Sequence, residues 1–134
     1  QKLGYVATVS SDGKPNISPK GTIIAWSDTL LAFAEIRSPD TLNNLQNNSF
    51  MEINVIDPLS RKGYLFAGTG KIIKNTPMYD DILNHYRRNG IESPINSIVI
   101  MSISSVSVVT SPLYDLGKSE DEIKLKWKKY FNDL

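Results

Sequence analysis

The chain has 134 residues, with 15 basic and 14 acidic side chains, a net charge of +1 and 40% hydrophobic residues. We therefore expect one globular domain over residues 1–134, and the near-zero charge argues against binding nucleic acid or an anionic membrane. The lack of cysteine and the single histidine, His85, exclude disulfides, thiolate catalysis and multi-histidine metal sites, and argue against a Ser-His-Asp centre. With no apolar run long enough to span a bilayer and no visible signal peptide, we expect a cytoplasmic protein.

The hydrophobic pattern predicts strands and helices in a mixed order. In chain order they are a strand over 3–10, strands over 16–25 and 30–35, a helix from Pro39 to Asn47-Asn48, strands over 51–55 and 64–73, a helix over 77–89, a strand over 95–110 and a helix over 120–134. Asp12-Gly13 favours a hairpin between the first two strands. Pro15 and Pro19 predict an edge or a break in the second strand, because proline cannot donate to a ladder.

Each predicted helix has a start signal. Ser38 and Thr76 can serve as N-caps, each followed by a proline at the first helical position. Ser119 and Glu122 have the spacing of a capping box. Six strands with short turns and a few helices predict a small antiparallel barrel with helices packed outside it.

The best candidate anion site is the segment 37–41. Arg37 precedes a helix start, where free N–H groups and the helix dipole attract negative charge, and Ser38 and Thr41 add hydroxyl donors. The alternative interpretation is an ordinary helix cap beside a solvated arginine.

Two further segments are weaker candidates. Residues 18–22, Ser-Pro-Lys-Gly-Thr, place a lysine and a glycine on a broken strand, where they could complete a phosphate site or form a plain edge strand. Residues 62–70 combine aromatics and glycines that could flank a ring or simply form barrel core and a bulge. No Walker phosphate loop and no Gly-x-Gly-x-x-Gly motif is present.

Taken in order, these segments resemble the flavin-binding split barrels of the pyridoxamine 5'-phosphate oxidase-like superfamily, and its short FMN-binding members in particular. The matching segments are 3–9, 12–16, 18–22, 37–48 and 63–70. The resemblance implies a mainly β (α+β) fold, a six-stranded antiparallel split β-barrel with peripheral helices. It also implies a homodimer with FMN at the subunit interface, and residues 51–55 or 64–66 could supply the apolar contact.

The resemblance further implies cofactor-binding roles for particular positions. Residues 18–22 would line the flavin ring and reach toward the phosphate, the strand end at 34–35 would contact the flavin chain through its backbone, residues 37–41 would grip the phosphate, and residues 62–64 would approach the flavin, often from the partner subunit. The positions are Ser18, Pro19, Lys20, Gly21, Thr22, Ala34, Glu35, Arg37, Ser38, Thr41, Lys62, Gly63 and Tyr64.

Two departures argue against pyridoxal phosphate synthesis. Only Arg37 is basic where pyridoxamine phosphate oxidases have two adjacent basic residues, and residues 127–131 do not match their arginine-rich end. We expect an FMN-binding oxidoreductase that uses a small-molecule electron donor or acceptor, with the chemistry carried by the cofactor. The alternatives are a non-enzymatic flavin carrier or sensor, a split barrel that binds deazaflavin, a haem protein, which the single histidine disfavours, and an interaction module without a cofactor.

Overall fold

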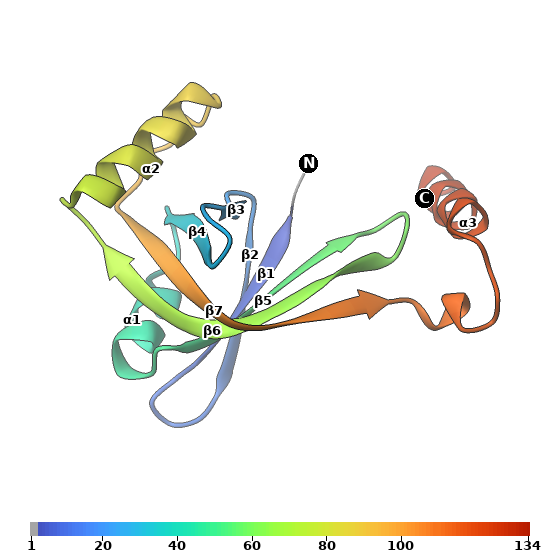
Figure 1. Cartoon of the computed structure of the whole chain (residues 1–134), viewed down its shortest axis with the longest axis horizontal. Coiled ribbons are helices and arrows are strands. Elements are labelled where there is room, and N and C mark those ends of the chain that lie inside the picture. Colours follow the sequence, from blue (N-terminus) through green and yellow to red (C-terminus); the bar gives the residue numbers. More distant parts are fainter. Residues whose placement is uncertain (1–2) are drawn as a thin grey trace.

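The computed structural model describes residues 3–134, which form one antiparallel sheet and three α-helices (Figure 1). In chain order the elements are β1 (Gly4–Val9), β2 (Pro15–Lys20), β3 (Ile24–Ala25), β4 (Leu30–Glu35), α1 (Pro39–Asn47), β5 (Phe50–Asp57), β6 (Lys62–Ile73), α2 (Pro77–Arg88), β7 (Ser97–Thr110), the 3-10 turn η1 (Pro112–Tyr114) and α3 (Glu120–Asn132).

The sheet curls into a barrel that stays open along one side. Its strand order is β2-β1-β5-β6-β7-β4-β3, and every neighbouring pair is antiparallel. β1 and β4 are not hydrogen-bonded to each other, yet Val6 of β1 and Phe33 of β4 are fully buried in one core together with Ile53 of β5. The prediction of a mainly β split barrel with helices is confirmed, and the split lies between β2 and β3.

The sheet has seven strands and not the six that the sequence predicted. The predicted strand over 16–25 divides, because residues 21–23 leave the sheet after Lys20 and cross from one of its edges to the other. Instead of continuing a ladder, Thr22 accepts a hydrogen bond at Oγ1 from the amide of Ala34 at 3.0 Å. The break that Pro19 indicated is therefore the opening of the barrel.

Two helices cover the barrel. Leu45 of α1 packs in the barrel core against Met51, so α1 lies across one end of the barrel (Figure 1). Ile82 and Tyr86 of α2 pack against the outer face of β4 and β7, where they form a second core with Ala34 and Ile98. The predicted N-caps Thr76 of α2 and Ser119 of α3 are confirmed, because each hydroxyl accepts a hydrogen bond from the backbone N–H three residues later.

α3 does not cover the barrel. The end of β5, the start of β6 and the second half of β7 extend from the barrel as an arm, residues 55–66 and 103–110, and α3 lies at the far end of this arm (Figure 1). The guanidinium of Arg61 stacks on the ring of Trp127 at 3.5 Å, and Lys62 pairs with Glu120 at 3.1 Å.

Within residues 3–134, none of the helices is long and apolar enough to cross a bilayer.

The arm exposes apolar side chains on the face that continues the barrel core. Tyr64 is 52% exposed and pairs with Val108, which is 72% exposed. Met51 and Ile53, by contrast, are buried inside their own barrel. The expectation that residues 51–55 offer a contact surface is therefore wrong for these two side chains, whereas Tyr64 is available.

Candidate functional site

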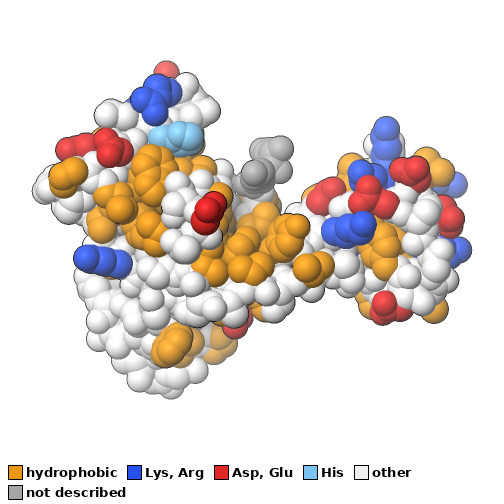
Figure 2. All heavy atoms as spheres, viewed as in Figure 1, with side chains coloured by type: hydrophobic (Ala, Val, Ile, Leu, Met, Phe, Trp, Pro, Cys, Tyr) orange, Lys and Arg blue, Asp and Glu red, His pale blue; other side chains and the backbone are white. Residues whose placement is uncertain are grey.

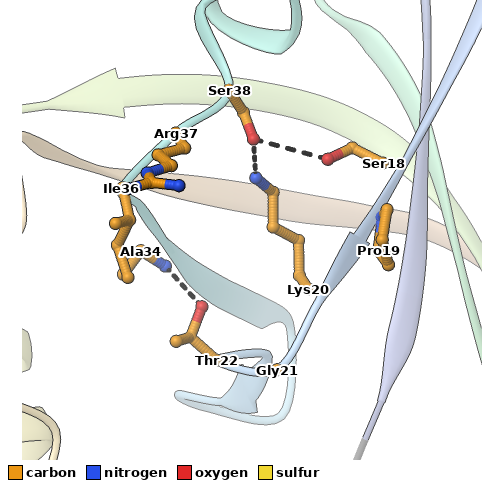
Figure 3. Close-up of a pocket in the computed structure, with 9 residues that line it drawn as sticks. All are labelled: Ser18, Pro19, Lys20, Gly21, Thr22, Ala34, Ile36, Arg37 and Ser38. Atoms are coloured by element: carbon orange, nitrogen blue, oxygen red, sulfur yellow. Dashed lines mark hydrogen bonds between the residues drawn. The ribbon is translucent and has the colours of Figure 1, made fainter. Parts of the chain in front are cut away.

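A pocket of about 340 Å³ opens where the barrel is split (Figure 3). It is formed by the end of β2, the crossing segment that follows it, the end of β4 and the start of α1. The lining residues are Ser18, Pro19, Lys20, Gly21, Thr22, Ala34, Ile36, Arg37 and Ser38. Residues 18–22, Ala34, Arg37 and Ser38, which the resemblance assigned to one cofactor site, thus line one pocket.

Thr22 is held from two sides. Its Oγ1 bonds to the Ala34 amide, and its carbonyl accepts a hydrogen bond from the hydroxyl of Tyr86 on α2 at 2.7 Å. These bonds satisfy polar groups of a backbone segment that has left the sheet, as a buried or half-buried backbone requires. Gly21 precedes Thr22, and the space where a side chain would stand is open, because a Cβ there would meet no atom within 4 Å.

Two cationic side chains face the pocket. Lys20 is buried, and its Nζ donates a hydrogen bond to Ser38 Oγ, while Arg37 is exposed and points toward the same space (Figure 3). Burial lowers the pKa of Lys20, because the charged amine has lost part of its hydration. In residues 3–134 neither cation takes part in an ion pair. Two cations that face one pocket and make no ion pair are suited to an anionic ligand.

Ser38 does not cap α1 in the expected way. It occupies the N-cap position, but its side chain makes no capping hydrogen bond, since Oγ is engaged by Lys20 and lies 3.4 Å from Ser18 Oγ. Its amide donates instead to Oε1 of Glu35 at 2.6 Å. Glu35 is 4% exposed and lies behind the pocket, where a side-chain carboxylate had no predicted role.

Thr41 lies outside the pocket lining. It is 1% exposed and belongs to the side of α1 that faces the barrel. On that same side, Asn44 donates a hydrogen bond to Thr8 Oγ1 of β1 at 3.1 Å. In this chain Thr41 is therefore placed to support α1 on the barrel, and its predicted contact with a phosphate stays a prediction.

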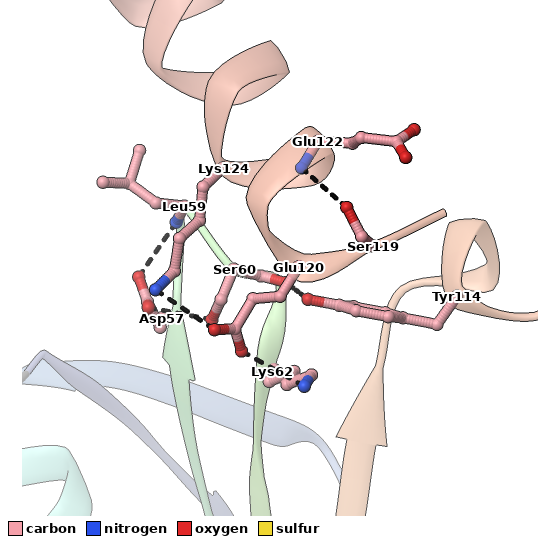
Figure 4. A network of polar contacts seen from close by, with 9 residues as sticks. All are labelled: Asp57, Leu59, Ser60, Lys62, Tyr114, Ser119, Glu120, Glu122 and Lys124. Carbon is pink, nitrogen blue, oxygen red and sulfur yellow. Dashed lines mark hydrogen bonds and ion pairs between the residues drawn. The ribbon is translucent and has the colours of Figure 1, made fainter. Parts of the chain in front are cut away.

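Lys62, Gly63 and Tyr64 lie on the arm, away from this pocket. Lys62 pairs with Glu120 of α3, which raises the pKa of the lysine by hydrogen bonding and charge (Figure 4). Gly63 is packed so tightly against β5 that a Cβ would approach the Val55 carbonyl oxygen to 2.0 Å. Tyr64 lines a separate apolar hollow with Ile23 and Phe66. Within one chain these residues do not join the pocket, so their predicted role requires a partner subunit.

Three residues around the pocket were not predicted from the sequence. Ile36 lines it between Ala34 and Arg37 and is visible in the sequence only as a neighbour of the anion segment. Tyr86 and Asn96 act over long distances in the chain, through Thr22 and Glu35 respectively. In the sequence, Tyr86 falls on the apolar face of the predicted helix over 77–89, which indicates burial but not a hydrogen-bond partner.

The structure thus defines a class of protein: a split barrel with helices, whose opening forms a cationic pocket. Comparison with protein families agrees with this, because the family Pyridoxamine 5'-phosphate oxidase matches residues 1–107. The chain belongs to the pyridoxamine 5'-phosphate oxidase family.

Solved structures with the same fold include three informative neighbours. HupZ of Group A Streptococcus is 27% identical, with a TM-score of 0.74 over 82% of this chain and 86% of that chain. An FMN-binding protein from Syntrophomonas wolfei subsp. wolfei is 14% identical, with a TM-score of 0.70 over 81% of this chain and 77% of its own. An F420 reductase is 24% identical, with a TM-score of 0.61 over 78% and 88%. The last two show the shared fold alone. Among curated proteins, none matches this chain.

Proposed function

We propose that this protein binds FMN, with the phosphate held at the pocket by Arg37 and Lys20. The observation that carries the proposal is that both cations face one pocket while neither is engaged in an ion pair within residues 3–134. A phosphate carries roughly 1.5 to 2 negative charges at neutral pH and accepts several hydrogen bonds. The hydroxyls of Ser18 and Ser38 lie beside Lys20 and can add such bonds.

The remainder of the pocket suits the uncharged part of the cofactor. Gly21 lets a flat group approach the backbone, because no side chain stands there and the space beside it is open. Ala34 and Ile36 supply small and apolar lining. When bound, a flavin supplies electron transfer that no side chain of this chain offers. The residues of the chain bind it, orient it and keep water from one of its faces.

We further propose a homodimer in which a second copy completes the site. The pocket of about 340 Å³ lies at the opening of the barrel, where a second copy can cover a bound ligand. The separate apolar hollow at Ile23, Tyr64 and Phe66 leads onto the exposed face of the arm. Figure 2 shows this hydrophobic surface as a band between the barrel and α3. Apolar area of this kind on a chain this small is typical of a protein contact.

We propose that the protein is an oxidoreductase with a small-molecule electron donor or acceptor. Two features argue against a pyridoxamine phosphate oxidase: a single arginine stands in the phosphate segment, and α3 is rich in lysine and not in arginine. Deazaflavin is the second candidate cofactor, because an F420 reductase shares the fold. A non-enzymatic flavin carrier is the alternative, and turnover with NADH or NADPH separates it from an enzyme.

The test begins with the absorption spectrum of the purified protein and mass identification of any released cofactor, which separates FMN from deazaflavin. Affinities for FMN and riboflavin are then measured for Arg37→Ala. Loss of one charge-assisted phosphate contact costs about 1.5–3 kcal/mol, so FMN affinity should fall about ten- to a hundredfold while riboflavin affinity changes little.

Arg88→Ala is the matched control, because Arg88 is an exposed arginine at the end of α2. Arg87 is unsuitable, since its Nη1 donates hydrogen bonds to the carbonyls of Ile91 and Ser93. If Arg37→Ala binds FMN as tightly as wild type, or loses riboflavin equally, the phosphate assignment is wrong.

A further inference from the structure

Glu35 is a buried carboxylate with hydrogen bonds but no cation in contact. Its Oε1 accepts a hydrogen bond from the Ser38 amide at 2.6 Å, and its Oε2 accepts one from Nδ2 of Asn96 at 3.4 Å. No ion pair among residues 3–134 includes it. Burying a charge that has no cation in contact costs free energy, which the two hydrogen bonds to Glu35 offset in part. The side chain is therefore a candidate for a role in the site.

Its position opposes the ligand that the pocket is built to attract. The N–H groups at a helix start are the donors that an anion uses, and Glu35 already occupies the Ser38 amide at the start of α1. A phosphate held at Arg37 and Lys20 would therefore lie in the field of a fixed negative charge. The low dielectric of a partly buried site makes that repulsion stronger than it would be in water.

Glu35 also interacts with Lys20 across the pocket wall. Its charge raises the pKa of Lys20, against the larger effect of burial, so the two groups act on each other without touching. With Lys20 and Arg37 positive and Glu35 negative, the charges at the pocket sum to +1. This sum matches a phosphate group with one negative charge better than a phosphate group with two.

We propose that Glu35 is a specificity-determining residue, which limits the affinity of the pocket for a doubly charged phosphate and lets singly charged phosphate esters bind comparably well. The proposal rests on the proposed function in that it takes the Arg37 pocket as the phosphate site. The proposal goes beyond the proposed function by naming the residue that sets which charge of a phosphate group the pocket prefers.

The first experiment needs no variant. Affinities of the wild-type protein are measured for FMN and for its singly charged methyl phosphodiester, with riboflavin as the phosphate-free reference. We expect FMN and the diester to agree within about threefold, as a pocket of charge +1 predicts. Glu35→Gln keeps an oxygen that can accept from Ser38 but removes the charge, so FMN should then bind about tenfold tighter than the diester. Riboflavin affinity should not change.

Three results would overturn the proposal. The first is a wild-type protein that binds FMN at least tenfold more tightly than the diester. The second is a Glu35→Gln protein whose FMN-to-diester ratio equals that of wild type. The third is a Glu35→Gln protein that loses FMN affinity, which would mean that the carboxylate serves the phosphate only by keeping Lys20 charged.

A flavin-free arm separates this proposal from the proposed function. Methyl phosphate and dimethyl phosphate carry the same two charge states on a small group, and their binding is followed by the chemical shifts of the Gly21 and Ser38 amides. Comparable binding of the two supports the role of Glu35 even if no flavin binds. Preference for methyl phosphate by tenfold or more, or no binding of either, overturns it even if the protein binds riboflavin.

Discussion

The hydroxyl of Tyr86 on α2 donates a hydrogen bond of 2.7 Å to the carbonyl of Thr22, although 64 residues separate the two in the chain. Thr22 belongs to the segment that crosses the opening of the barrel, and its other polar group is bonded to the Ala34 amide of β4. The two hydrogen bonds connect Thr22, which lines the pocket, to α2 on one side and to β4 on the other. The fold therefore positions the candidate site through contacts that are remote in sequence.

Tyr86→Phe should destabilise the protein by about 1–2 kcal/mol at neutral pH, because the Thr22 carbonyl loses its donor without any loss of ring packing. It should also weaken FMN and riboflavin equally, since it loosens the segment and leaves the cations in place. Urea unfolding gives the free energy, and Tyr130→Phe is the control because that ring is 53% exposed. An unchanged free energy of unfolding would mean that the hydrogen bond contributes nothing.

The same variant has a pH signature. Burial raises the pKa of the Tyr86 phenol far above its usual value of about 10, so above pH 10 the unfolded chain loses this proton before the folded chain does. Stability from the protonated phenol is complete below pH 10 and falls as the pH rises further. The wild-type protein should thus begin to lose its advantage over Tyr86→Phe above about pH 10 and lose more of it as the pH rises further, and stability curves that stay parallel above pH 10 would contradict the assignment.

The barrel and the pocket could be predicted from sequence because their signals are local. Alternating apolar residues gave the strands, and Ser38 followed by Pro39 correctly placed the start of α1. Pro15 and Pro19 indicated an edge or a break in the second strand, and Arg37 indicated an anion segment. That these segments meet depends on sheet order, which no local pattern encodes, so the likeness to a known family was needed to join them.

Other features could not be predicted in this way. Glu35 looked like a strand end, and only the chain geometry shows its carboxylate at the Ser38 amide. α3 was expected to pack outside the barrel, because an apolar stripe shows that a helix buries a face but not which surface receives it. In the structure Ile123 is buried while Tyr130 and Leu134 remain exposed, and the helix is fastened to the arm by Arg61.

The exposed face of the arm gives a prediction for assembly. Val108→Asp should convert the proposed homodimer to a monomer, because it places a charge on an apolar strand surface that the partner would cover. Light scattering measures the mass, and flavin affinity should fall along with it, since the site loses its second half. The variant itself should fold, because Val108 is 72% exposed in the single chain.

The matched control is Ile17→Asp. Ile17 is 69% exposed and lies on β2, where it pairs with Ala7 of β1. Its side chain is on the opposite face of the sheet from Lys20, and it is not part of the arm. It should leave the mass of the assembly unchanged. A dimer that survives Val108→Asp, or one that dissociates with Ile17→Asp instead, would move the interface away from the arm.

Two glycines give contrasting predictions for stability and binding. At Gly21 a Cβ would meet no atom within 4 Å, and at Gly68, beside the β-bulge of β6 and β7, a Cβ would approach the Ser102 carbonyl oxygen to 1.9 Å. Gly68→Ala should therefore destabilise the barrel by several kcal/mol, because strand backbone must move to remove the clash. Gly21→Ala should leave the free energy of unfolding within about 0.5 kcal/mol of wild type.

Binding should show the opposite order. The new methyl group of Gly21→Ala takes up open space beside a residue that lines the pocket, where a flat ligand is expected to approach the backbone. FMN and riboflavin should both lose about tenfold in affinity, which distinguishes a steric effect on the ring or chain from the phosphate effect of Arg37→Ala. Thermal unfolding and flavin fluorescence quenching on the same samples give both quantities. A Gly21→Ala protein that is as stable as wild type and binds both flavins unchanged would show that the cofactor does not lie against this segment.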